Sequence, residues 1–211
     1  MKDPIIKLEN LKKSYNHTFV LDIPYLEFEA NKLHIILGPN GSGKTTLLSI
    51  LADIEKIDHG KIYYKNKEVD NGMLRRKITL VLQSPYIFNT TVFNNIAYGL
   101  KIRSVAKKEI DDKVSVVLKK LGLEKFTNQN GIQLSQGEMH KVAIARALVI
   151  DPDMLLLDEP YSDLDPFNIQ LVENLLKETK KTIIMTTQDK DQTHRLADVF
   201  ITIKNGKVSY V

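Results

Sequence analysis

Short apolar runs alternate with amphipathic segments along most of the chain. The apolar runs predict strands at Ile5–Leu11, Leu26–Glu29, Leu33–Leu37, Lys61–Tyr64, Ile78–Leu82, Met154–Leu157, Thr182–Met185, Val199–Ile203 and Lys207–Val211. Apolar positions at helical spacing predict helices at Thr45–Ala52, Ala106–Leu121 and Val142–Val149, and Pro166 can open another at its first turn. The segment between Leu11 and Leu26 is expected to be rich in turns. This alternation predicts an α/β fold with a mostly parallel sheet.

One stretch of the chain carries a phosphate-binding pattern, G-x-x-x-x-G-K-(S/T), at every fixed position. It reads Gly38-Pro39-Asn40-Gly41-Ser42-Gly43-Lys44-Thr45-Thr46 and stands between a predicted strand and a predicted helix. Glycines let backbone N–H groups converge on phosphate oxygens, and the helix N-terminus adds its dipole. In this pattern Lys44 can reach the β- and γ-phosphates, and Thr45 can ligate Mg²⁺. The alternative is an ordinary glycine-rich turn, which the flanking strand and helix disfavour.

Composition limits the class of protein further. The 211 residues suffice for one large α/β domain or two small lobes. Lys+Arg 30 against Asp+Glu 26 gives a net charge of +4, and because the lysines are spread along the chain, no nucleic-acid partner is predicted. There is no cysteine, which excludes disulfides and thiolate metal sites and fits an intracellular location. No apolar run reaches the roughly 18 residues of a membrane span, and no secretory core follows Met1.

Two acidic residues follow the predicted strand Met154–Leu157. Asp158 and Glu159 would lie at the carboxyl end of a core strand, where open α/β sheets bind their ligands. There, Asp158 could hold Mg²⁺ through its water shell, and Glu159 could polarise an attacking water. Acidic residues at strand ends are common, so this pattern indicates a catalytic site only in combination with the phosphate-binding stretch.

Three further segments make a family resemblance specific. They are Leu134-Ser135-Gln136-Gly137-Glu138, Lys141–Leu148 and Asp158–Asp165. Together with the phosphate loop they resemble the ATP-binding-cassette (ABC) ATPases, over essentially the whole chain. The resemblance implies a single ABC ATPase domain, 1–211. It would comprise a P-loop NTPase core at 1–83 and 151–211, with an N-terminal antiparallel β part, and an inserted α-helical signature subdomain at about 84–150.

The resemblance also implies roles for residues that are unremarkable alone. Tyr15 matches the aromatic on which the family stacks adenine, and Gln83 matches the glutamine that contacts Mg²⁺ and water. Ser135 and Gly137 match the signature that contacts the γ-phosphate held by Lys44 of the other subunit. Without the family resemblance, Ser135 and Glu138 would be interpreted as a helix-capping box. The capping role and the contact to the γ-phosphate are compatible with each other. Asp163 and Asp165 match the loop that meets the partner subunit.

The chain departs from the family pattern in its switch residue, its signature and one turn. Gln188 stands where the family has a histidine; its amide can donate to a phosphate oxygen but cannot become cationic. In the signature, Gln136 replaces glycine, and Glu138 replaces glutamine, so the Glu138 carboxylate must point away from a phosphate or cap the helix. Asn31 replaces a glycine in a turn, where asparagine tolerates left-handed backbone.

The function implied by the resemblance is ATP hydrolysis coupled to membrane transport. ATP and Mg²⁺ are the implied cofactors, and Glu159, Gln83, Gln188 and Lys44 the implied catalytic residues. ATP would close a homodimer or heterodimer of ATPase subunits, and hydrolysis would reopen it. The implied partners are a transmembrane permease subunit and a substrate-binding protein, with the chain peripheral on the cytoplasmic face of the cell membrane.

The segment Gln83–Leu100 is similar to importer cassettes. Its apolar side chains are expected to line a groove for a membrane subunit; they are Tyr86, Phe88, Val92 and Phe93. The alternative is that they pack between subdomains. The stretch Ala97–Arg103 is similar to importers of oxyanions such as tungstate or molybdate, but the sequence does not identify the substrate.

Two other functions stay open at this point. A soluble ABC ATPase acting on ribosomes or nucleic acid usually has two cassettes or a long coiled coil, whereas this chain has one cassette and no sustained heptads. A nucleotide-binding regulator with low turnover is favoured by Gln188 alone, and an ATPase assay would distinguish it.

Overall fold

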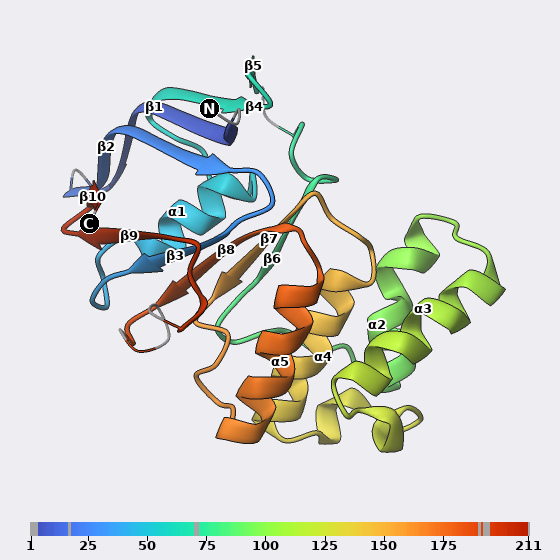
Figure 1. Cartoon of the computed structure of the whole chain (residues 1–211). Helices are drawn as coiled ribbons and strands as arrows, with labels where there is room; N and C mark the ends of the chain where they lie inside the picture. The colour runs from blue at the N-terminus through green and yellow to red at the C-terminus, as the bar shows by residue number, and fades with distance from the viewer. Residues whose placement is uncertain (1–3, 17, 70–71, 190, 192–194, 211) are drawn as a thin grey trace. The chain divides into compact units, whose positions relative to one another are not determined.

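The computed structural model describes residues 4–16, 18–69, 72–189, 191 and 195–210 (Figure 1). The chain divides into two compact units. The first unit comprises residues 1–80, 153–159 and 180–211, and the second comprises 81–152 and 160–179. Residues 160–179, which the sequence placed in the catalytic core, thus group with the helical unit. The functional division at 84–150 stays a prediction.

The first unit begins with an antiparallel sheet of strand order β2-β1-β4-β5. Its strands are β1 (Pro4–Tyr15), β2 (Thr18–Glu29), β4 (His59–Tyr64) and β5 (Lys67–Glu68). The prediction of turns between Leu11 and Leu26 is wrong, because β1 and β2 pair as one long hairpin from Pro4↔Glu29 to Tyr15↔Thr18. Leu21 and Ile23 alternate with more exposed residues along β2 and are fully buried, which is the pattern of a strand with one face on a core.

The second sheet of this unit has strand order β10-β9-β3-β8-β7-β6 and carries the predicted parallel core. Its strands are β3 (Leu33–Leu37), β6 (Ile78–Val81), β7 (Met154–Asp158), β8 (Thr182–Thr187), β9 (Val199–Lys204) and β10 (Lys207–Tyr210). β3 pairs in parallel with β8 and β9, and β7 with β8, while β9 and β10 form an antiparallel hairpin. The predicted α/β class with a mostly parallel sheet is confirmed.

Helix α1 (Lys44–Leu51) lies between these two sheets (Figure 1). Its buried leucines, Leu47, Leu48 and Leu51, belong to one apolar core with β1, β2, β3, β7, β8 and β9. Both faces of the helix are therefore fixed, and its N-terminus is held at the carboxyl ends of the parallel strands. This placement positions the phosphate loop, which connects β3 to α1.

The second unit is helical. Its helices are α2 (Val92–Ile102), α3 (Lys107–Lys120), α4 (Gln136–Leu148) and α5 (Pro166–Glu178), with short 3-10 turns at Glu124–Phe126 and Gly131–Gln133. α3 and the helix opened by Pro166 lie where the sequence predicted them. α4 begins at Gln136 rather than at Val142, and α2 was not predicted. Within the described ranges, no helix is long and apolar enough to cross a bilayer.

The segment expected to line a groove is only partly exposed. Val92 is fully buried, so the expectation that it lines an exposed groove is wrong. Tyr86 is 73% exposed and lies edge-on to Phe88, whose ring also contacts Tyr98. The Arg146 guanidinium stands 5.0 Å from the Phe88 ring centroid. An aromatic cluster of Tyr86, Phe88 and Tyr98 therefore marks this surface.

Candidate functional site at the phosphate loop and the acidic strand end

The loop between β3 and α1 can be built only with glycine at several positions. Gly41 and Gly43 have φ angles of 72° and 103°, in the left-handed region that L side chains rarely adopt. A Cβ added to Gly38 would lie 2.3 Å from the Ile203 carbonyl oxygen, and one added to Gly43 would lie 2.6 Å from Leu21 Cδ2. The glycines of the motif therefore let the loop turn tightly against β9 and β2.

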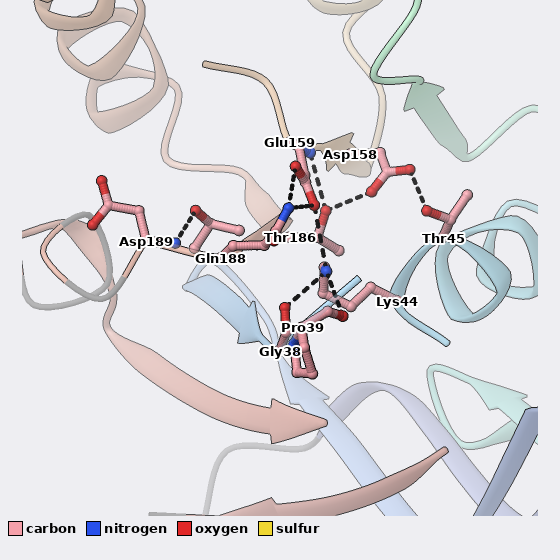
Figure 2. A network of polar contacts seen from close by, with 10 residues as sticks. Gly38, Pro39, Lys44, Thr45, Asp158, Glu159, Thr186, Gln188 and Asp189 are labelled. Carbon is pink, nitrogen blue, oxygen red and sulfur yellow. Dashed lines mark hydrogen bonds and ion pairs between the residues drawn. The ribbon is translucent and has the colours of Figure 1, made fainter. Parts of the chain in front are cut away.

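Lys44 points across the mouth of this loop (Figure 2). Its Nζ donates to the carbonyl oxygens of Gly38, at 2.9 Å, and Pro39, at 3.2 Å. It also lies 3.3 Å from Glu159 Oε1. Lys44 is only 5% exposed, and a buried ammonium requires such acceptors. The same donors are available to an anionic ligand that displaces the carboxylate.

Asp158 is held by two hydroxyl groups at the end of β7. Thr45 Oγ1 donates to its Oδ2 at 2.7 Å, and Thr186 Oγ1 donates to its Oδ1 at 2.6 Å. The Asp158 residue is 4% exposed, and Thr186 is fully buried. The structure thus brings together Thr45 and Asp158, two of the three residues that the sequence analysis assigned to Mg²⁺; the third, Gln83, belongs to the second unit.

Glu159 and Gln188 form the outer part of the same network (Figure 2). Gln188 Nε2 donates to both carboxylate oxygens of Glu159, at 3.0 and 3.1 Å. The Glu159 backbone N–H donates to Thr186 Oγ1 at 3.0 Å. Glu159 has φ 45°, a left-handed conformation that is unusual for this residue type. The predicted base and the predicted switch residue are therefore in direct contact.

Thr186 is a member of this network that sequence reasoning missed. Its signal lay in strand register, because Asp158 and Thr186 are opposite residues on the parallel neighbours β7 and β8. Thr186 is a polar residue at the carboxyl end of β8, and β8 is the neighbour of the strand that ends in Asp158. This combination is the signal that identifies it. That register becomes visible only when the order of the strands is known.

The residues present fit a bound triphosphate with its Mg²⁺. The Ser42 side chain is 3% exposed, and its Oγ has no hydrogen-bond partner among the residues that the structure describes. Buried polar atoms normally have a partner, so this hydroxyl suits a ligand oxygen at the start of α1. Beside it, Lys44 supplies positive charge, and Thr45 with Asp158 supplies the hard oxygen ligands that Mg²⁺ prefers.

Tyr15 lies at the end of β1 in the same unit, with 43% of its surface exposed. Lys13 Nζ lies 5.0 Å from the centroid of its ring and 2.8 Å from Glu55 Oε1. The Tyr15 ring is half-exposed, and it is held by a cation–π contact with Lys13, which is itself paired with Glu55. Such a ring is suited to stacking against a flat ligand.

The other predicted site residues belong to the second unit. The Gln83 side chain is exposed, and its carbonyl oxygen contacts His140 Nε2. A Cβ added to Gly137 would lie 2.9 Å from the Asp163 carbonyl oxygen, so glycine is needed where α4 meets this loop. A hollow of about 600 Å³ opens here, lined by residues that include Ser135, Gly137 and Asp163.

Ser135 begins α4 with the capping box that the sequence predicted. Its Oγ accepts from the Glu138 N–H, while Glu138 Oε2 accepts from the Ser135 N–H at 2.9 Å and from its hydroxyl at 2.8 Å. The expectation that Glu138 caps the helix is confirmed. Asn31 likewise has φ 58°, as expected for a residue replacing glycine in its turn.

The known proteins to which this chain is similar are ATP-binding components of transporters. Residues 21–162 match the model of the family described as ABC transporter. The chain is 40% identical, over 96% of both chains, to the tungstate uptake system ATP-binding protein TupC of Peptoclostridium acidaminophilum. It is 37% identical to the spermidine/putrescine import ATP-binding protein PotA of Clostridioides difficile, over 99% of this chain and 62% of that longer protein.

Solved structures with the same fold include two transporter cassettes. One is cbiO1 from Clostridium perfringens, part of the transporter complex cbiONQ, with a TM-score of 0.87, 32% identity and coverage of 99% of this chain and 88% of the other. Another is a bacterial ABC transporter cassette solved as a dimer, with a TM-score of 0.86, 31% identity and coverage of 97% and 96%.

Proposed function

The chain belongs to the ABC transporter family as an ATP-hydrolysing subunit of the importer type, and we propose that Lys44, Thr45, Asp158 and Glu159 carry out this hydrolysis on Mg·ATP. The observation that carries the assignment is the single polar network that joins the phosphate loop to both acids. The motif and the acids lie far apart in the sequence, and β3, β7 and β8 bring them to one edge of the sheet.

The phosphate loop provides binding. Gly38 to Thr46 would cradle the phosphates with backbone N–H groups, with Lys44 exchanging its contact to Glu159 for the β- and γ-phosphates. Tyr15 would stack on adenine. Since Lys44 is buried and already desolvated, most of the cost of presenting its charge is met before ATP arrives.

Hydrolysis transfers the γ-phosphoryl group to water. Thr45 and Asp158 would hold Mg²⁺, which when bound would neutralise charge on the phosphates; Gln83 keeps the Mg²⁺ contact that the family resemblance implies for it. Glu159 would accept the proton of the attacking water, and Gln188 would orient the Glu159 carboxylate through the two hydrogen bonds from its amide. Phosphoryl transfer depends mainly on positioning and charge stabilisation, which this network of short contacts supplies.

The working unit would be a dimer of cassettes attached to a membrane protein. Ser135 and Gly137 of one subunit would contact the ATP held by Lys44 of the other, at the hollow beside Asp163. A permease subunit would bind the aromatic cluster of Tyr86, Phe88 and Tyr98, placing the chain at the cytoplasmic face of the membrane. A substrate-binding protein completes the proposed importer.

The substrate class is proposed from one relative. The chain is 40% identical to the tungstate system's subunit over 96% of both proteins, and 37% identical to the polyamine importer subunit. This comparison favours an oxyanion such as tungstate. The substrate would pass through other subunits, so no residue of this chain is assigned to it.

The experiment that tests the proposal is a comparison of wild type with Lys44→Ala. Calorimetric titration should show Mg·ATP binding that is lost in the variant, because the substitution removes the ammonium that the loop carbonyls and Glu159 hold at this site. Steady-state phosphate release should fall to background. Unchanged affinity would overturn the phosphate-loop assignment, and binding without turnover in the wild type would favour the regulator instead.

A further inference from the structure

Thr186 stands between the two acids of the site and contacts both. It lies in β8 with no exposed surface. Its Oγ1 is 2.6 Å from Asp158 Oδ1 and 3.0 Å from the Glu159 backbone nitrogen. Figure 2 shows this hydroxyl at the centre of the network, between the side chains of Asp158 and Gln188.

The chemistry of the two contacts fixes the direction of each hydrogen bond. A backbone N–H can only donate, so the Thr186 oxygen accepts from Glu159. The single hydroxyl proton is then committed to the Asp158 carboxylate. Thr186 therefore occupies Oδ1 of Asp158 with a hydrogen bond. The other oxygen, Oδ2, remains available to Thr45 and to a metal ion.

The backbone at Glu159 depends on the same hydroxyl. A non-glycine residue at φ 45° is held there only when its surroundings outweigh the conformational cost. The hydrogen bond from the Glu159 N–H to Thr186 stabilises this conformation and so sets where the Glu159 side chain leaves the strand. Packing does not require a hydroxyl here, because valine has nearly the same shape and also favours strands.

We propose that Thr186 is a positioning residue for ATP hydrolysis, which orients the carboxylates of Asp158 and Glu159 through one bifunctional hydroxyl. The proposal rests on the function proposed above, because it requires that these acids act on Mg·ATP. It assigns to Thr186 a role in turnover and in the use of Mg²⁺, and none in holding the phosphates.

The test compares Thr186→Val with Thr182→Val and Thr186→Ser. Thr182 is a matched control, because it is 1% exposed in the same strand and its hydroxyl accepts from the Asn31 N–H at 2.9 Å, away from both acids. Thr186→Val should lower turnover at saturating Mg·ATP by about tenfold, since it removes a hydrogen bond to a charged group. It should also raise the Mg²⁺ concentration needed for half-maximal turnover, while calorimetric affinity for Mg²⁺-free ATP stays unchanged.

The controls separate positioning from loss of structure. Thr182→Val should keep wild-type turnover and the same Mg²⁺ dependence, and Thr186→Ser, which keeps the hydroxyl, should restore both. Circular dichroism melting gives the folded fraction of each variant, to which the rates are normalised.

Several results would overturn the proposal. One is a Thr186→Val rate, per folded protein, equal to that of Thr182→Val. Others are a serine variant as slow as the valine variant, or an unchanged Mg²⁺ dependence in Thr186→Val. Failure of the proposed function would look different, because Glu159→Gln would then retain wild-type turnover whatever residue stood at position 186.

Discussion

Replacing Glu159 with glutamine should strengthen binding of ATP while it slows hydrolysis. In the structure, the Glu159 carboxylate lies 3.3 Å from Lys44 Nζ, and the two side chains are 16% and 5% exposed. Two unit charges at this distance attract by about 5 kcal/mol if the effective dielectric constant is about 20. Desolvation offsets most of this attraction, and a net value of about 1.5–3 kcal/mol is typical for a hydrogen bond to a charged group.

The γ-phosphate must compete with this carboxylate for the ammonium, and it also meets the negative charge of Glu159. Glutamine keeps the size of the side chain and can still accept from Gln188, but it removes both effects. The affinity for a triphosphate should therefore rise roughly tenfold to 150-fold, the ratio that corresponds to about 1.5–3 kcal/mol. ADP, which lacks the γ-phosphate, should gain less.

The assay is calorimetric titration of wild type and Glu159→Gln with a non-hydrolysable ATP analogue and with ADP. Asp153→Asn is the matched control, because Asp153 is a lysine-paired acid at the opposite end of β7. Size-exclusion chromatography of Glu159→Gln with Mg·ATP should also show an accumulated dimer. An affinity equal to or weaker than that of the control variant would refute the reasoning that Glu159 competes for Lys44.

Three further predictions concern other parts of the first unit. Gln188→His should raise basal phosphate release at saturating ATP, because a charge-assisted hydrogen bond is about twice as strong as a neutral one; an unchanged rate would show that Gln188 already suffices. Tyr15→Ala should weaken binding of ATP but leave inorganic tripolyphosphate binding intact, and equal losses in titrations with both ligands would contradict adenine stacking. Burial lowers the pKa of His34, whose Nε2 contacts the Glu29 carbonyl at 3.0 Å. The unfolded chain therefore binds the proton more readily, and stability should fall as pH drops below about 6.5. Melting temperatures between neutral and mildly acidic pH should show this slope in wild type and a smaller slope in His34→Gln, and parallel curves would exclude His34 as its source.

The parts of the site that short motifs define could be predicted from the sequence. The phosphate loop is one such part, because Gly41 and Gly43 have left-handed φ angles that glycine adopts readily. Asp158 and Glu159 are another, because an apolar run followed by acids marks the end of a buried strand. Thr186 could not be predicted in this way, since its meaning comes from pairing with Asp158 across β7 and β8.

Two misjudged segments of the fold have physical explanations. The segment predicted to be rich in turns contains Pro24, which lies within β2; β2 is an edge strand of its sheet, where proline is tolerated. In α2, Asn94, Asn95 and Gly99 lower the helix propensity. Tertiary contacts outweigh this, because the fully buried Asn95 side chain bonds to the backbone of Phe88.

The capping box at the start of α4 has a consequence for how two cassettes would associate. Glu138 Oε2 already accepts from both the N–H and the hydroxyl of Ser135. A phosphate from a partner's ATP that binds at Ser135 must therefore displace a tethered carboxylate, and two anions cannot share these donors without repulsion. Closure of the dimer becomes an exchange of one anion for another. This chain should accordingly need more ATP to dimerise than a variant with uncharged glutamine at position 138.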